Sequence, residues 1–224
     1  MLYAGTWTIH ADKRSDCATW FASMSEETLV ARAGPDVKVL GRWHNLADGS
    51  GFFVCEAKSV TALYEVLWNG WAEDLATFKV APMLSDDMCR EIVLGTKPAF
   101  SMSLDSLYDD PRDGESLYIG HSKIHPEHKL QTYETLAGMT EEDEIKDRGK
   151  CRFLGRFHNM CDGTGFGVAA ATNEIDLYKW TYHWAGSADI TWVPVVKDKT
   201  MQAIIKKKDG YDAKLASVME KMKV

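Results

Sequence analysis

The amino-acid sequence predicts an α+β fold built from two tandem copies of one unit. The first observation is a twelve-residue motif that occurs twice, at Gly41–Phe52 and Gly155–Phe166, with eight identical positions. The second is that strand-like and helix-like patterns alternate in the same order around both copies of the motif. The third is the length, because 224 residues suffice for two small domains.

Each copy is expected to contain four strands and two helices. In the first copy a helix is entered near Asp12, Ser59 caps a second helix, and the Asp48-Gly49 turn joins the two central strands. The expected strands of this copy are 2–9, 37–44, 51–56 and 78–82. The second copy repeats the pattern, with a helix through 130–136. The order β-α-β-β-α-β is that of a ferredoxin-like unit. Helices cover one face of such a sheet, so we expect the two units to form an intramolecular pseudo-dimer.

The expected domains follow this repeat. They are a first repeat (1–96), an acidic linker (97–115), a second repeat (116–208) and a C-terminal helix (209–224). The C-terminal helix has an apolar stripe with helical spacing, formed by Leu215, Val218, Met219 and Met222. Two alternatives remain open for it: the tail folds back on its own chain, or these side chains are assembly contacts on a neighbouring subunit.

Composition argues against several functional classes. A net charge of −7 disfavours binding to a nucleic-acid backbone. No apolar run approaches the roughly 20 residues of a membrane-spanning helix. The five cysteines form no Cys-x-x-Cys pair, and His121, His125 and His128 straddle a strand end and a loop. The sequence therefore predicts no metal site and no cofactor. Because the chain starts directly with a strand pattern, we expect no targeting peptide in it.

The repeated motif supplies the candidate site. Strict alternation along its strand predicts Val39, Gly41 and Trp43 on one face and Leu40, Arg42 and His44 on the other. If the apolar faces meet the helices, the arginine and histidine faces of the two copies meet across the pseudo-two-fold axis and line an anion-binding cavity. Alternatively, the arginines pair with Asp48 and Asp162 and hold an inter-repeat seam, while the Asn and Asp residues form turns. The candidate ligand-binding or seam residues are Arg42, His44, Asn45, Asp48, Arg156, His158, Asn159 and Asp162.

These residues also carry a resemblance to known proteins. The Gly41-Arg-Trp-His stretch, the Asp48-Gly-x-Gly-Phe turn, the helix with Leu63-Tyr64 and the strand ending at Pro82 resemble an uncharacterised bacterial family. That family is a domain of unknown function in the dimeric α+β-barrel, ferredoxin-like group, and the resemblance covers roughly 1–96 and 116–206. The tandem with its tail also resembles the diatom pyrenoid shell proteins (PyShell), which assemble into sheets around the Rubisco matrix in plastids. This second resemblance implies self-association, Rubisco-matrix partners and a plastid location. Without it, a cytoplasmic location is expected.

Because no residue set in the sequence specifies a reaction, it favours a structural, self-assembling protein over an enzyme. The expected assembly is a sheet-like or tubular lattice, such as the shell of a pyrenoid. The alternative is a monooxygenase-like enzyme, or a binder of a small anion, that uses the inter-repeat cavity. This alternative rests on analogy with monooxygenases and haem-degrading enzymes of the same fold.

Overall fold

The computed structural model of the chain describes residues 1–72 and 75–221 and divides into two compact units. Unit 1 contains Met1, Tyr3–Ala81 and Val195–Val224, and unit 2 contains Leu2 and Pro82–Pro194. Each unit thus joins the body of one sequence copy to the C-terminal segment of the other copy. The domain boundaries expected from the sequence follow the repeats, whereas the compact units do not.

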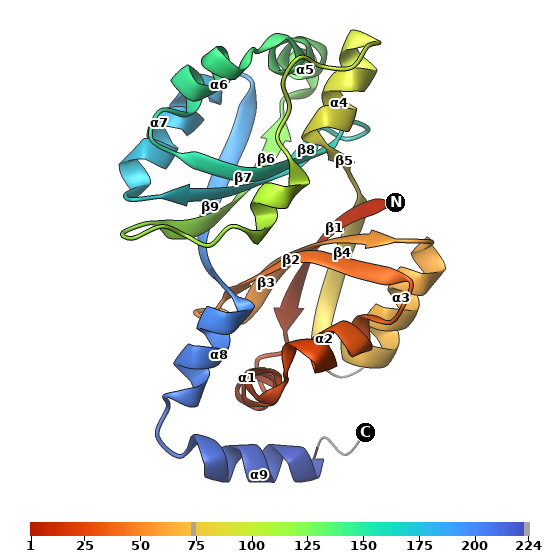
Figure 1. Ribbon diagram of the computed structural model, residues 1–224, viewed down its shortest axis with the longest axis vertical. Helices are drawn as coiled ribbons and strands as arrows, with labels where there is room; N and C mark the ends of the chain where they lie inside the picture. The colour runs from red at the N-terminus through yellow and green to blue at the C-terminus, as the bar shows by residue number, and fades with distance from the viewer. Residues whose placement is uncertain (73–74, 222–224) are drawn as a thin grey trace. The chain divides into compact units, whose positions relative to one another are not determined.

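Unit 1 is a sheet with the strand order β4-β1-β3-β2. Helices α1, α2 and α3 pack on one face of this sheet (Figure 1). Its strands are β1 (Leu2–Ile9), β2 (Val37–Asn45), β3 (Ser50–Ala57) and β4 (Ala76–Pro82). Its helices are α1 (Arg14–Ser23), α2 (Glu26–Ala33), α3 (Val60–Leu67), a π-helical turn (Trp68–Ala72), α8 (Asp198–Lys206) and α9 (Tyr211–Lys221).

Unit 2 has the strand order β9-β6-β8-β7-β5. Its strands are β5 (Leu84–Ser85), β6 (Ser116–Ile124), β7 (Arg152–Asn159), β8 (Thr164–Ala171) and β9 (Ala188–Lys197), whose last residues belong to unit 1 and pair there with β2. Its helices are α4 (Asp86–Leu94), α5 (Lys129–Gly138), α6 (Glu141–Arg148) and α7 (Glu174–Trp184), with 3₁₀ turns at Leu104–Tyr108 and Pro126–His128. The predicted α+β class is confirmed.

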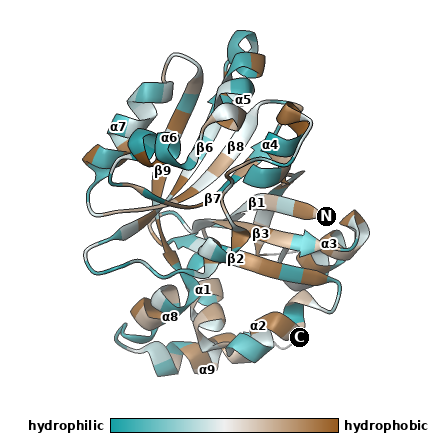
Figure 2. Cartoon of the chain, turned by 45° about the horizontal axis from the view of Figure 1, so that its top comes forward, coloured by the Kyte–Doolittle hydropathy of each residue, from teal (hydrophilic) through white to brown (hydrophobic). Residues whose placement is uncertain are grey.

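The single helix expected between the first two strands of each copy is in fact two helices. Ser25 and Thr140 have extended backbones, and each side chain caps a new helix, α2 and α6. Thr140 forms a full capping box with Asp143. The charged α6 is mostly teal in Figure 2, in contrast to the browner strands. Asp12 does not cap α1, which begins at Arg14, whereas Ser59 caps α3 as expected.

A β-bulge in each central hairpin corrects the predicted side-chain alternation. Val39 pairs with Cys55 and Gly41 pairs with Val54, so that Leu40 is an extra residue; Leu154 has the same position in β7. An extra residue shifts the alternation of all residues that follow it. Val39 therefore shares a face with Arg42 and His44, and that face carries the helices. The expectation that the Arg/His face points away from the helices is wrong.

The C-terminal helix α9 packs on its own chain in unit 1. Val218 is 0% exposed and belongs to a core cluster with Trp20, Phe21, Leu29 and Met201. Met219 is 51% exposed, Leu215 is partly exposed, and Met222 lies outside the described residues. Of the expected assembly contacts, Val218 is thus unavailable to a neighbouring subunit.

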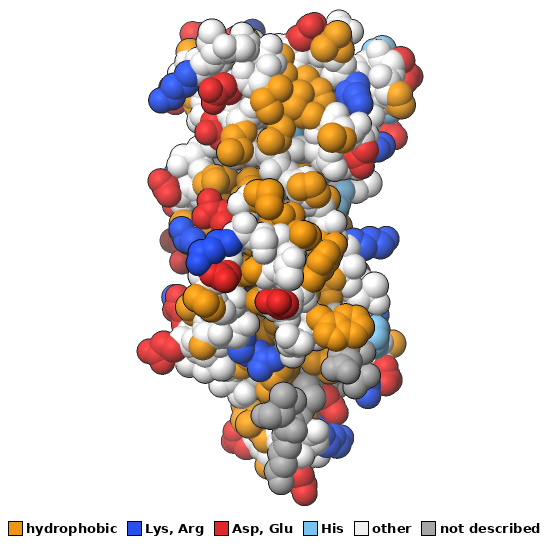
Figure 3. Space-filling model, turned by 90° about the vertical axis from the view of Figure 1, so that its right-hand side faces the viewer, with side chains coloured by type: hydrophobic (Ala, Val, Ile, Leu, Met, Phe, Trp, Pro, Cys, Tyr) orange, Lys and Arg blue, Asp and Glu red, His pale blue; other side chains and the backbone are white. Residues whose placement is uncertain are grey.

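Other apolar side chains of the repeats lie at the surface. In α3 and α7 the equivalent residues Tyr64 and Tyr178 are exposed, and so is Trp68. Hydrophobic side chains are interspersed with charged ones on the face shown in Figure 3. The acidic linker is held in unit 2, where Leu107 is buried and Arg152 binds Glu115. No helix in the described part of the chain is long and apolar enough to span a bilayer.

We expect the substitution Val218→Asp to destabilise unit 1 strongly, because it places an unpaired charge in the core. The cost is about 3 kcal/mol or more, which lowers Tm by roughly 6–12 °C in a chain of this size. Met219→Asp, on the exposed side of the same helix, is the matched control and should change Tm little. Differential scanning calorimetry of both variants tests this. Equal Tm values for V218D and the native chain would show that α9 does not belong to the core.

Candidate functional site

The Arg/His pair of the first motif meets a carboxylate from the C-terminal segment. Arg42 Nη2 donates to Asp198 Oδ2 at 2.6 Å, and Arg42 Nε lies 3.2 Å from the same oxygen. His44 Nε2 lies 2.7 Å from Asp198 Oδ1. Asp198 is the first residue of α8, where the helix dipole also favours a negative charge. One carboxylate thus fixes both side chains that the bulge directs into the interior of unit 1.

The electrostatics keep Asp198 ionised. Burial raises the pKa of Asp198, but the hydrogen bond with His44 and the charge of Arg42 outweigh burial, and the net effect lowers its pKa. An ionised carboxylate on Nε2 leaves Nδ1 of His44 as the nitrogen that can exchange a proton with another molecule. His44 itself is buried between the rings of Trp7 and Phe21.

The remaining predicted site residues form the hairpin turns. Asn45 Oδ1 accepts from the Ala47 amide at 3.0 Å, and Asp48 Oδ1 accepts from the Ser50 amide at 2.8 Å. Asn159 and Asp162 make the same contacts to the amides of Cys161 and Thr164. The hypothesis that Arg42 and Arg156 pair with Asp48 and Asp162 is therefore wrong. These four side chains shape the hairpin loops, and Asn45 also lines the wider groove beside His44.

In unit 2 the second motif joins a larger buried network. Arg156 Nε donates to Asp86 Oδ1 at 3.0 Å, and its Nη2 donates to Glu144 Oε1 at 2.6 Å. Arg90 donates to Asp86 Oδ2 at 2.9 Å and also binds Glu144. His158 Nε2 lies 3.6 Å from Asp86 Oδ1. Two arginines and two carboxylates thus neutralise one another in the interior.

Pairing sets the protonation of this network. Burial raises the pKa of Asp86, but Arg156, His158 and Arg90 reverse the effect and hold its pKa well below the usual range. Burial lowers the pKa of Arg156, and the charges of Asp86 and Glu144 outweigh burial and raise it. Burial lowers the pKa of His158, which favours its neutral form. Arg156 and Asp86 therefore stay charged across the neutral range.

Asp86 and Asp198 are functional residues that the sequence analysis missed. They lie 112 residues apart, the same offset that relates Pro82 to Pro194, so they occupy equivalent positions in the two copies. Each begins a helix, α4 or α8, and each binds the Arg/His pair of the other copy's motif. Extending the repeat alignment past the prolines would have found them.

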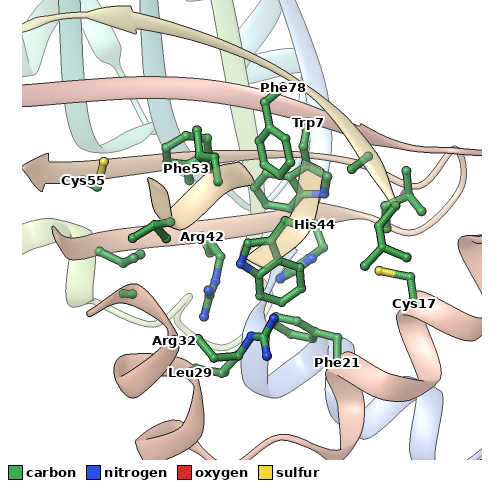
Figure 4. Close-up of a pocket in the computed structure, with 18 of the residues that line it drawn as sticks. Trp7, Cys17, Phe21, Leu29, Arg32, Arg42, His44, Phe53, Cys55 and Phe78 are labelled. Atoms are coloured by element: carbon green, nitrogen blue, oxygen red, sulfur yellow. The ribbon is translucent and has the colours of Figure 1, made fainter. Parts of the chain in front are cut away.

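Arg42 and His44 lie in the wall of a pocket inside unit 1 (Figure 4). Its cavity volume is about 100 Å³. The strands supply one wall and helices α1 and α2 the opposite wall, with mostly apolar side chains. Among the lining residues are Trp7, Val39, Phe53, Val66 and Phe78, together with Cys17, Phe21, Leu29 and Arg32. Burial raises the pKa of Cys17 to about 11 and that of Cys55 to about 12, so the two pocket thiols are protonated and are not nucleophiles.

A wider groove borders the same histidine. It has a volume of about 520 Å³ and shares Trp7, His44 and Met201 with the inner pocket. Its other lining residues include the basic side chains of Arg14, Lys208 and Lys214. Asp209 also lines the groove, and Lys214 is paired with Asp16, so the groove carries charges of both signs beside His44.

Unit 2 has an interior cavity of about 80 Å³ beside Arg156. Phe153, Trp180 and Trp192 pack together there, with ring centroids 4.8–6.0 Å apart. In unit 1 the residues equivalent to Phe153 and Trp180 are the smaller Val39 and Val66. Conversely, Trp7 and Phe53 of unit 1 correspond to the smaller Ser122 and Gly167 of unit 2. The two interiors have thus been repacked differently around the same Arg/His pair.

Comparison with known proteins identifies the family. A family model described as a domain of unknown function, DUF3303, matches residues 1–97 and 116–209. The chain belongs to this family. The two matched segments agree with the repeat found in the sequence, and the resemblance to an uncharacterised domain family is confirmed. A search of curated proteins found no match.

Solved structures with this fold include enzymes. A provisionally assigned chlorite dismutase has a TM-score of 0.52, with 12% identity over 91% of this chain and 99% of that chain. A dye-decolorizing peroxidase from Bacteroides thetaiotaomicron has a TM-score of 0.51, with 8% identity over 91% and 94% of the two chains. A provisionally assigned monooxygenase from Lactobacillus acidophilus has a TM-score of 0.45, with 10% identity over 88% and 93%. At these identities the likeness shows the fold alone.

These matches correct the functional expectation from the sequence. The preferred hypothesis of a lattice-forming structural protein, and with it the expectation that the chain is not an enzyme, is contradicted by the two matches with TM-scores above 0.5, which both carry the names of enzymes. They favour the alternative of an enzyme or small-ligand binder. The structure provides a pocket for it inside unit 1, lined by Arg42 and His44 of one motif only.

Haem, which the fold analogy suggests, does not fit either of the two interior cavities. An engineered cavity of about 150 Å³ is filled by benzene, so cavities of about 100 and 80 Å³ are far too small for a tetrapyrrole. The Nε2 atom of His44 is held by Asp198, and that of His158 is buried beside Asp86. Within residues 1–72 and 75–221, no three His, Cys, Asp or Glu side chains are placed to hold a metal ion.

The depressed pKa of Asp86 predicts an acid-sensitive unit 2. The unfolded-state pKa of Asp is about 3.9 and the folded-state value is lower. The stabilisation by ionised Asp86 is therefore complete above about pH 5 and is lost as pH falls toward the folded-state pKa. Asp86→Asn should cost about 3–5 kcal/mol at pH 7, and the Tm difference from the native chain should shrink between about pH 5 and pH 2.

Thermal unfolding followed by circular dichroism across this pH range provides the measurement. Asp189→Asn, which changes an exposed carboxylate of the same unit, is the control and should leave the profile unchanged. A Tm difference for D86N that is constant from pH 7 to pH 2 would contradict the assigned cause.

Proposed function

We propose that the chain is an enzyme that binds a small, largely apolar anion in the unit 1 pocket and transfers a proton at His44. One observation carries the proposal: Arg42 and His44 are both hydrogen-bonded to Asp198, and both line a cavity whose other side chains are apolar except for Arg32. Perturbed, mutually bonded charged groups in an apolar pocket are the usual mark of a functional site.

Arg42 is the proposed anion-binding residue. A guanidinium carries five N–H donors in a fixed plane, and Asp198 accepts from only Nε and Nη2 of Arg42. The guanidinium also lies over the ring of Phe21, at 5.2 Å from the ring centroid, so its plane is fixed before a ligand arrives. Burial from water strengthens the attraction of such a donor for an anion.

His44 is the proposed general base. Asp198 orients the imidazole through Nε2 and stabilises the protonated ring, as the acidic partner does in many His–Asp dyads. Nδ1 of His44 then accepts a proton from the bound molecule, and the reverse transfer returns the proton to the product. Trp7 and Phe21 exclude water from the ring, which strengthens both electrostatic contacts.

Binding without chemistry is the second candidate for the same pocket. The pyrenoid-shell assignment, with Rubisco-matrix partners and a plastid location, finds no support in the comparisons and forms no part of the proposal. Asn45, Asp48, Asn159 and Asp162 are assigned to the turns and not to the ligand.

Arg42→Met should weaken binding of a small anion by roughly 10–100-fold, because one charge-assisted hydrogen bond contributes about 1.5–3 kcal/mol. Arg42→Lys keeps the charge and should lose less. Arg112→Met, an exposed arginine of unit 2, is the matched control. Isothermal titration with a panel of small organic anions and their neutral amides gives the affinities. Equal affinity in R42M and R112M would refute the role of Arg42.

His44→Gln should lower the rate of proton exchange by roughly 100-fold or more while the ligand still binds. The rate is measured by NMR as replacement of C–H by deuterium in pyruvate and its branched and aromatic analogues in D₂O. His183→Gln changes a surface histidine that also contacts an aspartate, Asp147, and should leave the rate unchanged. If ligands bind and neither variant nor the native protein exchanges protons, the pocket is a binding site only.

A further inference from the structure

The two interior sites differ at two equivalent positions. Counting four residues from the helix caps Ser25 and Thr140 gives Leu29 in unit 1 and Glu144 in unit 2. Counting four residues from Asp198 and Asp86 gives Gln202 in unit 1 and Arg90 in unit 2. The equivalence is also spatial. Gln202 donates to the Met24 carbonyl at 3.1 Å and Arg90 donates to the Met139 carbonyl at 2.9 Å, at matching helix ends.

In unit 2, Glu144 behaves as a ligand that the chain itself provides. Its side chain is almost fully buried, and Oε1 accepts from Nη2 of both Arg156 and Arg90. Arg156 is thereby bound on one side by Asp86 and on the other by Glu144. The arginine of the second motif is fully used by the protein's own carboxylates.

In unit 1 the corresponding carboxylate is missing. Leu29 has no acceptor atom, and Gln202 brings no second positive charge. Among the described residues, Asp198 is the one carboxylate within ion-pair distance of Arg42. Leu29 and Arg42 both line the cavity, and Figure 4 shows Arg42 extending from its strand toward the helix that carries Leu29. Unit 1 therefore has the arginine and an adjoining space where unit 2 has the arginine and a carboxylate.

We infer that unit 1 binds a monocarboxylic acid, and that its carboxylate binds Arg42 as Glu144 binds Arg156. This inference rests on the proposed function and adds the class of substrate. The cavity of about 100 Å³ is lined by Trp7, Phe21 and Phe53 and is smaller than the roughly 150 Å³ that benzene fills, so the body of the acid is a short branched aliphatic group. In unit 2 the equivalent position beside Arg156 is permanently occupied by the carboxylate of Glu144.

The inference predicts that Glu144 can be transplanted to unit 1. Leu29→Glu with Gln202→Arg rebuilds the unit 2 network around Arg42 and should weaken binding of isobutyrate, used as the probe, by at least 10-fold. Leu29→Gln with Gln202→Arg has nearly the same size and lacks the new carboxylate, so it is the matched control and should retain binding. Titration calorimetry gives the affinities, and circular dichroism with Tm confirms that both double variants are folded.

The converse exchange opens unit 2. Glu144→Leu with Arg90→Gln removes the internal carboxylate together with its second arginine, leaving Asp86 paired with Arg156. Because Phe153, Trp180 and Trp192 fill part of this interior, formate is the probe for this variant. With Arg42→Met added so that unit 1 does not respond, millimolar formate should raise the Tm of this variant and should not raise that of R42M alone. Arg156→Lys in the same background keeps the charge and should reduce the rise.

The outcomes separate the inference from the proposed function. If R42M abolishes isobutyrate binding and L29E/Q202R leaves it intact, the pocket is functional and the Glu144 analogy is overturned. If the native chain binds isobutyramide and not isobutyrate, the carboxylate class is overturned while the pocket stands. If neither probe binds and no other small acid of the panel does, both proposals fail. Loss of binding in L29E/Q202R with retention in L29Q/Q202R supports the inference.

Discussion

The architecture of this chain depends on an arginine–aspartate pair that occurs in each unit, partly buried in unit 1 and fully buried in unit 2. In unit 1 it joins Arg42 to Asp198, and in unit 2 it joins Arg156 to Asp86. Each pair connects a central strand of one repeat to the helix that ends the other repeat. A buried charge without its partner costs several kcal/mol. The fold of each unit is therefore destabilised if either the strand or the helix is missing from this contact. The histidine two residues after each arginine then takes its place beside the same carboxylate.

The bulge at Leu40 and Leu154 makes this pair compatible with an apolar interior. Without an extra residue, Arg42 would lie on the opposite face from Val39, away from the helices. With it, the polar ends of Arg42 and His44 enter the layer between sheet and helices, where Asp198 can reach them. Gly41 follows the bulge, and the ring of Trp43 covers it so closely that a Cβ atom there would collide with the indole. The motif is thus a local solution for turning charged residues inward.

The sequence was sufficient for the repeat, the main strands, the cap at Ser59 and the turns at Asn45 and Asp48, because these follow from local patterns. It was insufficient for the site. Alternation along β2 could not reveal the bulge, since Leu40 is as apolar as a regular core residue. Asp198 has no local signal beyond its place before a helix, and its partner lies more than 150 residues away in the chain. The pairing of Arg42 with Asp198 is a long-range contact, and the pattern near the motif suggested Asp48 instead. The difference between Leu29 and Glu144 is visible in the aligned repeats. Its significance follows only from the structure, in which Glu144 contacts Arg156.

Fusion of the two copies has a consequence for how the protein could change over time. In a homodimer of single copies, every substitution appears twice, so one interior cannot lose a carboxylate while the other gains it. A tandem chain removes this restriction: positions 29 and 144 are inherited separately, and so are 202 and 90. One interior can then serve as a rigid, self-neutralised support while the other varies in size and charge. Yet the exchanged ends, Pro82 onward in unit 2 and Val195 onward in unit 1, keep the copies interdependent. A gene for either half alone would encode a unit whose arginine has no aspartate.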